Sequence, residues 1–422
     1  MNSKAKIVTL PIALLTIFIL FTFLPILYTF FPFLGKMKIV LLAGIGLLVS
    51  YLMTVHKYTN HNVGRNPIFI LWLSFVFIMF LGLLGSYDRG LTAMMIEAVI
   101  KIVLSVAIMA KIIDSEDRLD LILTVFAFCA VGMALSTIVN YLFIGYTFEE
   151  TIRGAGIKSG TMADPNDLAL FLNSSLPLLF YYVSYSKKRM ITLLSVTIVT
   201  IAVILTYSRG GFIGLCTVYF GLLVIRKNKR IKSFAILAAC AFAFIAFAPN
   251  EYMERLSTII VESKVDENTG EYPGRMQAWI SLLPAGMEKP IFGAGAGGSI
   301  YIASKNIGDW HLVHNTFLQI FLEMGFVGLS CYLLIYLFVY RQYLRFQRYA
   351  YENGMGDQKI EMYKYLILCL VTFAVTAFFL PQAYSPLFFV LSGFVLANHE
   401  IMVKNIVRIE KSKTLSLEKI GE

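Results

Sequence analysis

The chain has 422 residues, of which 58% are apolar and 15% charged, and its formal net charge is +10. Soluble domains are typically about 45–50% apolar and about 25% charged, so this composition excludes a soluble globular protein. The five cysteines lie in apolar stretches without CxxC spacing, which argues against both disulfides and a zinc site. The positive charge does not indicate nucleic-acid binding, because the basic residues follow a membrane topology.

Apolar runs of about 17–25 residues recur along the whole chain, as membrane-spanning helices require. The first run is too long for the apolar region of a signal peptide and lacks a small-residue cleavage site, so we interpret it as an uncleaved helix. We predict an all-α integral membrane protein with about twelve transmembrane helices, forming a single polytopic domain over residues 1–422. The predicted spans cover residues 7–33, 38–55, 67–85, 92–111, 119–145, 165–186, 190–206, 211–225, 233–248, 313–340, 362–381 and 385–403.

Basic residues predict the side of the membrane on which each link lies. They cluster in the links after the sixth, eighth and tenth spans and in the tail 404–422, and twelve spans place all of these on one side. We predict that this side is cytoplasmic and that both termini lie there. The clustered residues in the three links are Lys187, Lys188, Arg189, Arg226, Lys227, Lys229, Arg230, Lys232, Arg341, Arg345 and Arg348.

The opposite, extracytoplasmic side carries one long insertion, residues 249–312, between the ninth and tenth spans. Loops of this length are uncommon and often functional, so we predict a small extracytoplasmic subdomain. Residues 274–283 within it are predicted to form a short interfacial helix with Trp279 at headgroup level. The glycine-rich run 293–298 fits neither the Rossmann fingerprint nor the P-loop, and we predict a flexible loop there.

Three residues on this side are candidates for chemistry on a phosphate-bearing substrate. Arg209 lies in Ser208-Arg209-Gly210-Gly211, where glycines allow a tight turn with positive φ and an arginine can bind an anion bidentately. Arg275 directly precedes the interfacial helix. His314 opens the tenth span, where the helix dipole disfavours a protonated imidazole and so suits a general base. Each also has a structural interpretation. Arg209 could reach lipid phosphate, Arg275 could be a solvated loop charge, and His314 could be a hydrogen-bonded interfacial histidine.

The segment before the sixth span holds two further cations, Arg153 and Lys158, among glycines. They are consistent with either a phosphate cradle or an ordinary loop. Asp164, followed by a proline, is predicted to cap the sixth span.

Glu97, Lys101 and Glu323 are charged residues well inside predicted spans. Glu97 and Lys101 are four residues apart and are predicted to neutralise each other. Glu323 is either functional or a buried hydrogen-bond acceptor. The sequence contains no carboxylate cluster and no metal-ligand spacing, which favours a mechanism without a metal ion or other cofactor.

Taken in order, these motifs resemble the O-antigen ligase and O-antigen polymerase superfamily of bacterial membrane proteins. The resemblance covers roughly residues 150–340. It rests on Ser208-Arg209-Gly210-Gly211, on Gly274-Arg275 ahead of Trp279, and on the run from His314 to Ile320 followed by Glu323-Met324-Gly325. The run Asp164-Pro165-Asn166-Asp167 is also similar to many members.

The resemblance implies a GT-C-like fold in the bacterial inner membrane. It implies inverting, metal-independent transfer of a glycan from undecaprenyl diphosphate to a hydroxyl acceptor, such as lipid A-core, at the outer face. Arg209 and Arg275 would hold the diphosphate as leaving group, and His314 would take the proton of the attacking hydroxyl. Arg153, Lys158 and Asn315 are further candidates for substrate contacts. The expected partners are the lipid-linked donor, the glycan acceptor and membrane lipids, with no nucleic acid.

Two alternatives remain open from the sequence. A polymerase would use the same donor site to lengthen a glycan, and the compact single external loop and the run from His314 favour a ligase only slightly. A twelve-helix transporter or lipid-linked glycan flippase is less favoured, because such proteins are built from repeated halves and no half-repeat is evident here.

Overall fold

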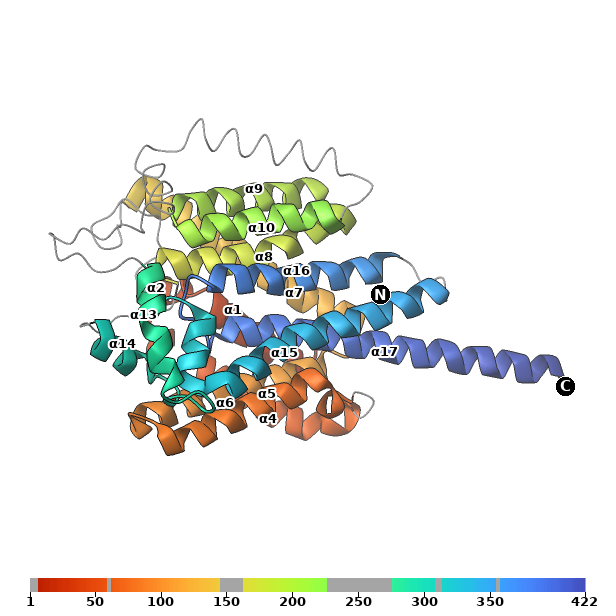
Figure 1. Cartoon of the computed structure of the whole chain (residues 1–422). Helices are drawn as coiled ribbons and strands as arrows, with labels where there is room; N and C mark the ends of the chain where they lie inside the picture. The colour runs from red at the N-terminus through yellow and green to blue at the C-terminus, as the bar shows by residue number, and fades with distance from the viewer. Residues whose placement is uncertain are drawn as a thin grey trace.

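The computed structural model describes residues 7–58, 62–144, 162–225, 275–307, 313–353 and 357–421. All the regular secondary structure in these ranges is helical, as predicted. The longer helices run side by side in a bundle, and α13 and α14 lie at one of its ends (Figure 1). The main helices are α1 (Leu10–Phe23), α4 (Ile39–Thr54), α5 (Pro67–Gly82), α6 (Arg89–Ile112), α7 (Glu116–Val139), α8 (Pro165–Tyr185), α9 (Arg189–Leu205), α10 (Arg209–Ile225), α13 (Arg275–Met287), α14 (Ser299–Ile307), α15 (Thr316–Glu352), α16 (Asp357–Ala377) and α17 (Pro386–Gly421).

Eight helices of the described ranges are long and apolar enough to cross a membrane: α4, α5, α6, α7, α8, α15, α16 and α17. The shorter apolar helices α1, α9 and α10 coincide with three other predicted spans. The predicted ninth span, residues 233–248, lies outside the described residues. The total of twelve spans and the placement of the 249–312 loop between spans nine and ten therefore stay predictions.

The first predicted span, residues 7–33, is not one continuous helix. Helix α1 ends at Phe23, and the short helices α2 (Leu27–Phe30) and α3 (Pro32–Lys36) follow. Pro25 and Pro32 account for the difference, because proline lacks the backbone N–H that would continue a helix.

The tenth predicted span also differs. Helix α15 continues to Glu352 and is broken at Gly325, whose φ of 66° and ψ of −166° are not helical. At the end of the chain, α17 runs on as a helix through residues 404–421, most of the predicted tail.

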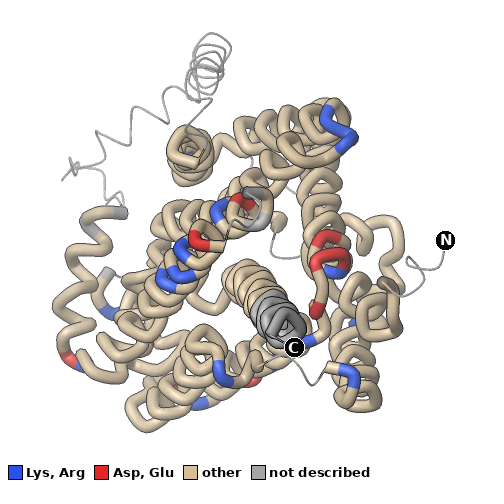
Figure 2. The backbone as a smooth tube through the Cα atoms, turned by 90° about the vertical axis from the view of Figure 1, so that its right-hand side faces the viewer, with Lys and Arg blue, Asp and Glu red and all other residues tan. Residues whose placement is uncertain are grey.

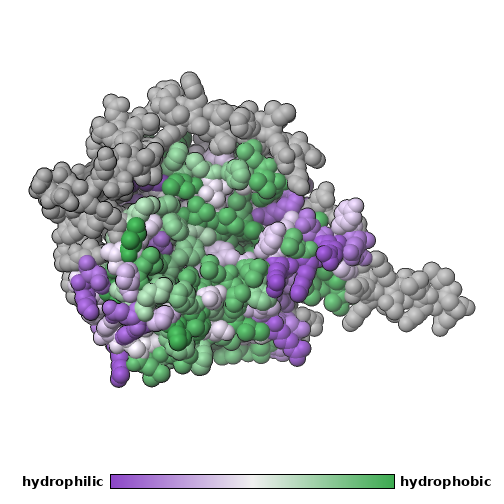
Figure 3. Space-filling view, in the orientation of Figure 1, coloured by the Kyte–Doolittle hydropathy of each residue, from purple (hydrophilic) through white to green (hydrophobic). Residues whose placement is uncertain are grey.

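Burial separates inner from outer helices. Within their most apolar stretches, 83% of the residues of α8 and of α17 are buried, against 17% for α4. Helix α4 exposes Leu41, Ile45, Val49 and Leu52, as expected of a helix in contact with lipid. Figure 3 shows the corresponding apolar surface between two more hydrophilic ends.

The two ends of the bundle differ in character. Helices α8, α10 and α15 begin at the end where α13 and α14 lie (Figure 1). Figure 2 looks onto the other end, toward which α17 extends, and Lys and Arg residues lie around it. We refer to this second end as the basic end, and the distribution of charge predicts that it is cytoplasmic.

A buried polar cluster joins three helices near the basic end. Asn66 caps α5 by accepting a hydrogen bond from Ile68 N (3.0 Å), and its Nδ2 donates to Glu400 Oε1 on α17 (3.1 Å). Gln342 Nε2 of α15 donates to Asn66 Oδ1 (2.8 Å). The Asn66 side chain therefore caps α5 and joins it to α15 and α17.

Replacing Asn66 by alanine should lower the free energy of unfolding by about 1–3 kcal/mol, because a cap is lost and Glu400 and Gln342 lose their partner. Thermal unfolding of the purified protein in detergent measures this change. Asn405→Ala is the matched control, since Asn405 also donates to a glutamate, Glu116 Oε1 (2.9 Å), but in an exposed place. Equal melting temperatures for the two variants would contradict a bracing role for Asn66.

Candidate active site

Arg209 is the first residue of α10 and lies where the starts of α8 and α10 meet. Ser208 Oγ accepts a hydrogen bond from Gly211 N (3.1 Å) and donates to Asn166 Oδ1 (2.8 Å). Asn166 in turn donates its backbone N–H to Asp164 Oδ1 (2.7 Å), which confirms the predicted cap of α8. The caps of α8 and α10 are thus hydrogen-bonded to each other, and Arg209 directly follows Ser208 of this junction in the chain.

The glycines after Arg209 have a different role from the predicted one. Gly210 and Gly211 are helical, and the positive φ falls instead on Tyr207 (50°). A Cβ atom at Gly211 would lie 2.8 Å from Ala169 Cβ, and one at Gly214 would lie 2.2 Å from Thr376 Oγ1. These glycines let α10 approach α8 and α16 closely, so the prediction of a tight glycine turn was wrong.

His314 directly precedes the first turn of α15 in a left-handed conformation, with φ of 45°. The half-buried histidine is followed by Asn315, whose Oδ1 accepts from Phe317 N and Leu318 N, both at 3.0 Å. Asn315 is therefore the cap of α15 and is nearly fully buried. Its predicted contact with substrate stays a prediction, whereas its structural role is now clear.

Backbone strain is concentrated near these candidates. Among the described residues, Lys38, Tyr207 and His314 are the non-glycine residues with positive φ. One of them is a candidate itself and another lies two residues before Arg209. Such conformations cost free energy and cluster at functional sites.

The loop between α16 and α17 connects the start of α15 to the start of α8. Thr316 Oγ1 donates to Leu380 O (2.7 Å) and accepts from Gln382 N (2.9 Å). Gln382 Nε2 donates to Asp167 Oδ1 in the first turn of α8 (2.7 Å). A continuous set of polar contacts therefore joins the helix starts that carry His314 and Arg209. Thr316, Gln382 and Asp167 could not be grouped from the sequence, because their pairing depends on tertiary contact.

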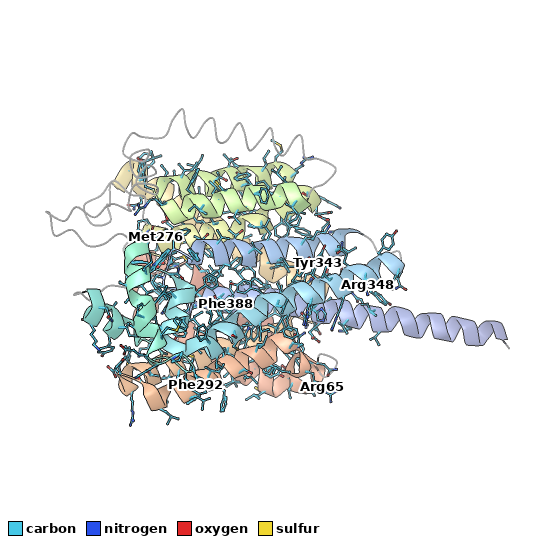
Figure 4. The ribbon with its side chains drawn as sticks, viewed as in Figure 1. Arg65, Met276, Phe292, Tyr343, Arg348 and Phe388 are labelled. Carbon is cyan, nitrogen blue, oxygen red and sulfur yellow. The ribbon has the colours of Figure 1, made fainter. Side chains whose placement is uncertain are left out.

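The helix predicted for residues 274–283 is present as α13, and its position at the membrane interface stays a prediction. Trp279 Nε1 donates to Val313 O (2.8 Å), and the indole packs edge-on against Phe378 with ring centroids 5.3 Å apart. Trp279 therefore holds the segment just before His314. Arg275 is the first residue of α13, one turn before Trp279, and its side chain lies outside the described part of the chain. Figure 4 labels the next residue, Met276, at this end of the bundle, opposite Arg348.

Two predicted substrate contacts, Arg153 and Lys158, fall in residues 145–161, outside the described residues. Glu97 and Lys101 form the predicted ion pair on α6, with both side chains largely exposed. No group of three His, Cys, Asp or Glu side chains in the described ranges could hold a metal ion.

Glu323 is a fully buried acceptor just before the break in α15. Its carboxylate accepts from Ser299 Oγ (2.5 Å), Tyr384 Oη (2.5 Å) and Gln319 Nε2 (3.3 Å). Gln319 Oε1 also accepts from Ala383 N (3.3 Å). Glu323 thus ties α14, α15 and the α16–α17 loop together beneath the helix starts, which favours the structural interpretation.

The glycine-rich run 293–298 is buried and packs into the break of α15. Ala294 N donates to Leu322 O (2.9 Å) and Gly295 N to Glu323 O (3.0 Å). These are carbonyls that the break at Gly325 leaves without helical partners. The prediction of a flexible loop was wrong. The glycines adopt positive φ values (68° at Gly293, 84° at Gly295) and allow close backbone contact.

Comparison with known protein families decides the assignment of this region. Residues 193–333 match the family described as O-antigen ligase. This part of the chain is therefore similar to O-antigen ligases. Among curated proteins, none matches the chain.

The O-antigen ligase match confirms the resemblance found in the motifs. The family indicates a ligase- or polymerase-type membrane enzyme that acts on lipid-linked glycans in the bacterial inner membrane. The matched residues include Arg209, Arg275 and His314, whereas Asp167 and Gln382, which link the start of α8 to the start of α15, lie outside the match. The hydrogen bonds of Asp167 and Gln382 are therefore known from the structure and not from the family match.

Gly293→Ala tests the packing of the buried glycine run 293–298. A Cβ atom there would lie 2.3 Å from the carbonyl carbon of Glu323. We expect a loss of about 1–3 kcal/mol from overpacking and about 1–2 kcal/mol from the left-handed conformation, seen as a lower melting temperature. Gly64→Ala is the matched control, because its Cβ would meet nothing within 4 Å. A Gly293→Ala variant that melts like Gly64→Ala would show that the run is loosely packed.

Proposed function

We propose that this protein is an O-antigen ligase-type glycosyltransferase. It transfers a glycan from undecaprenyl diphosphate to a hydroxyl acceptor, such as lipid A-core, at the outer face of the cytoplasmic membrane. The observation that carries the proposal is the polar connection between the start of α10, with Arg209, and the start of α15, with His314. It runs through Ser208, α8, Gln382 and Thr316.

The proposed reaction needs one proton acceptor and stabilisation of a departing anion. The acceptor hydroxyl oxygen attacks the anomeric carbon while His314 takes its proton. The bond between this carbon and the phosphate oxygen breaks with inversion, and the electron pair leaves with the diphosphate. Arg209 and Arg275 bind the diphosphate and stabilise the charge that develops on it, which arginine can do without a metal ion.

The helix starts add to this electrostatic environment. Helices α8, α10 and α15 direct their N-termini, and so the positive ends of their dipoles, toward the same end of the bundle. Helix N-termini favour bound phosphate groups. A diphosphate at this end would therefore meet positive potential from the backbone as well as from the arginines.

A polymerase with the same donor site is the second candidate, since the family indicates both ligase- and polymerase-type enzymes. The two functions differ in the acceptor, which is lipid A-core for a ligase and the next repeat unit for a polymerase. The products that accumulate when the site is disabled distinguish them.

Arg209→Ala, Arg275→Ala and His314→Ala should each abolish complementation of a deletion strain. Loss of a charge-stabilising group costs about 10²–10³-fold and loss of a general base about 10²–10⁴-fold in rate. Surface glycan and carrier-linked glycan are read together on gels, with membrane levels checked by immunoblot. Arg348→Ala is the control, because it removes an exposed arginine at the basic end.

The outcomes separate the functions. Long glycan retained on the carrier identifies a ligase, and single repeat units identify a polymerase. Full activity in all three variants, at normal membrane levels, would contradict the arginine–histidine mechanism.

A further inference from the structure

A large groove lies at the basic end, away from the candidate active site. Its volume is about 1100 Å³. Helix α16 packs against both α10 and α15, and residues of all three helices line the groove together with the end of α8. Within the described ranges, the groove opens between α10 and α15, and α16 forms its floor.

The chemistry of the lining changes along the groove. Toward the middle of the bundle it is apolar, with Phe220 of α10 and Leu368 and Val371 of α16. Toward the basic end it becomes polar, with Gln347 of α15, the ion pair of Lys364 with Glu361, and exposed Arg189 at the start of α9. The lining therefore passes from apolar to cationic, as a phospholipid passes from its acyl chains to its charged headgroup.

Tyrosines mark the level at which this change occurs. Tyr185, Tyr340, Tyr343 and Tyr365 all line the groove, and Figure 4 labels Tyr343 on α15 beside α16. Tyrosine is enriched where the bilayer meets water. The polar end of the groove therefore lies at the depth of lipid headgroups, and the apolar end at the depth of acyl chains.

The charge near the polar end selects the kind of headgroup. Exposed Lys187 and Lys188 precede Arg189, and exposed Arg345 and Arg348 flank Gln347 on α15. Basic pockets between transmembrane helices on the cytoplasmic side favour anionic lipid headgroups. The groove volume also exceeds the usual range of about 300–1,000 Å³ for small-ligand pockets.

We propose that this groove binds one anionic phospholipid of the leaflet at the basic end. Its phosphate lies beside Arg189, and an acyl chain lies along α10 and α16. The site does not depend on the proposed transferase function. The lipid lies over α16, between α10 and α15, and these two helices carry Arg209 and His314 at their far ends.

Native mass spectrometry of the full-length protein tests the proposal, with phosphatidylglycerol and phosphatidylcholine as probes. We expect one phosphatidylglycerol bound in preference to phosphatidylcholine. Arg189→Gln should weaken this binding about five-fold, the effect expected for one basic residue near an anionic headgroup. Arg65→Gln, which removes an exposed arginine at the basic end that does not line the groove (Figure 4), should leave the affinity unchanged.

A second variant tests the apolar part of the lining. Val224→Trp should fill the groove and reduce lipid binding while the protein still elutes as a folded species in size-exclusion chromatography. Equal binding of both lipids, or equal effects of Arg189→Gln and Arg65→Gln, would overturn the proposal. It would also be overturned if Leu344→Cys formed a disulfide with Cys240 in a Cys216→Ser background, because the chain itself would then occupy the groove.

Discussion

The need to satisfy backbone N–H groups at helix starts is the constraint on which the candidate site depends. A helix that begins where water is excluded cannot satisfy its first backbone N–H groups with water. Side chains must therefore accept hydrogen bonds from these groups. Asp164, Ser208 and Asn315 do this for α8, α10 and α15. Because Ser208 also bonds to Asn166, the same contacts that cap the helices hold them together.

The break in α15 follows the same logic one layer deeper. At Gly325 the helical hydrogen bonds of α15 are interrupted. The backbone N–H groups of Ala294 and Gly295, in the buried glycine run, donate instead to the carbonyl oxygens of Leu322 and Glu323. The carboxylate of Glu323 then collects hydroxyl donors from two other segments. The first turns of α15, and with them His314, are fixed from below as well as from the α16–α17 loop.

Much of the fold could be predicted from apolar periodicity, because lipid demands long apolar helices, and α13 and the cap at Asp164 followed from local signals. The candidates Arg209 and His314 could also be found locally, as isolated charges at span ends. The glycine run could not, because its burial depends on positive φ values matched to a break in another helix. The bond between Gln382 and Asp167 joins residues 215 positions apart, a pairing that no local pattern encodes.

The most direct test of the proposed site is a cryo-electron microscopy structure of the full chain in lipid nanodiscs with undecaprenyl diphosphate bound. The proposed function predicts diphosphate density at the end of the bundle where α8, α10 and α15 begin, in contact with Arg209 and within reach of His314. Density for the diphosphate at any other place, with the Arg209–His314 region empty, would contradict it.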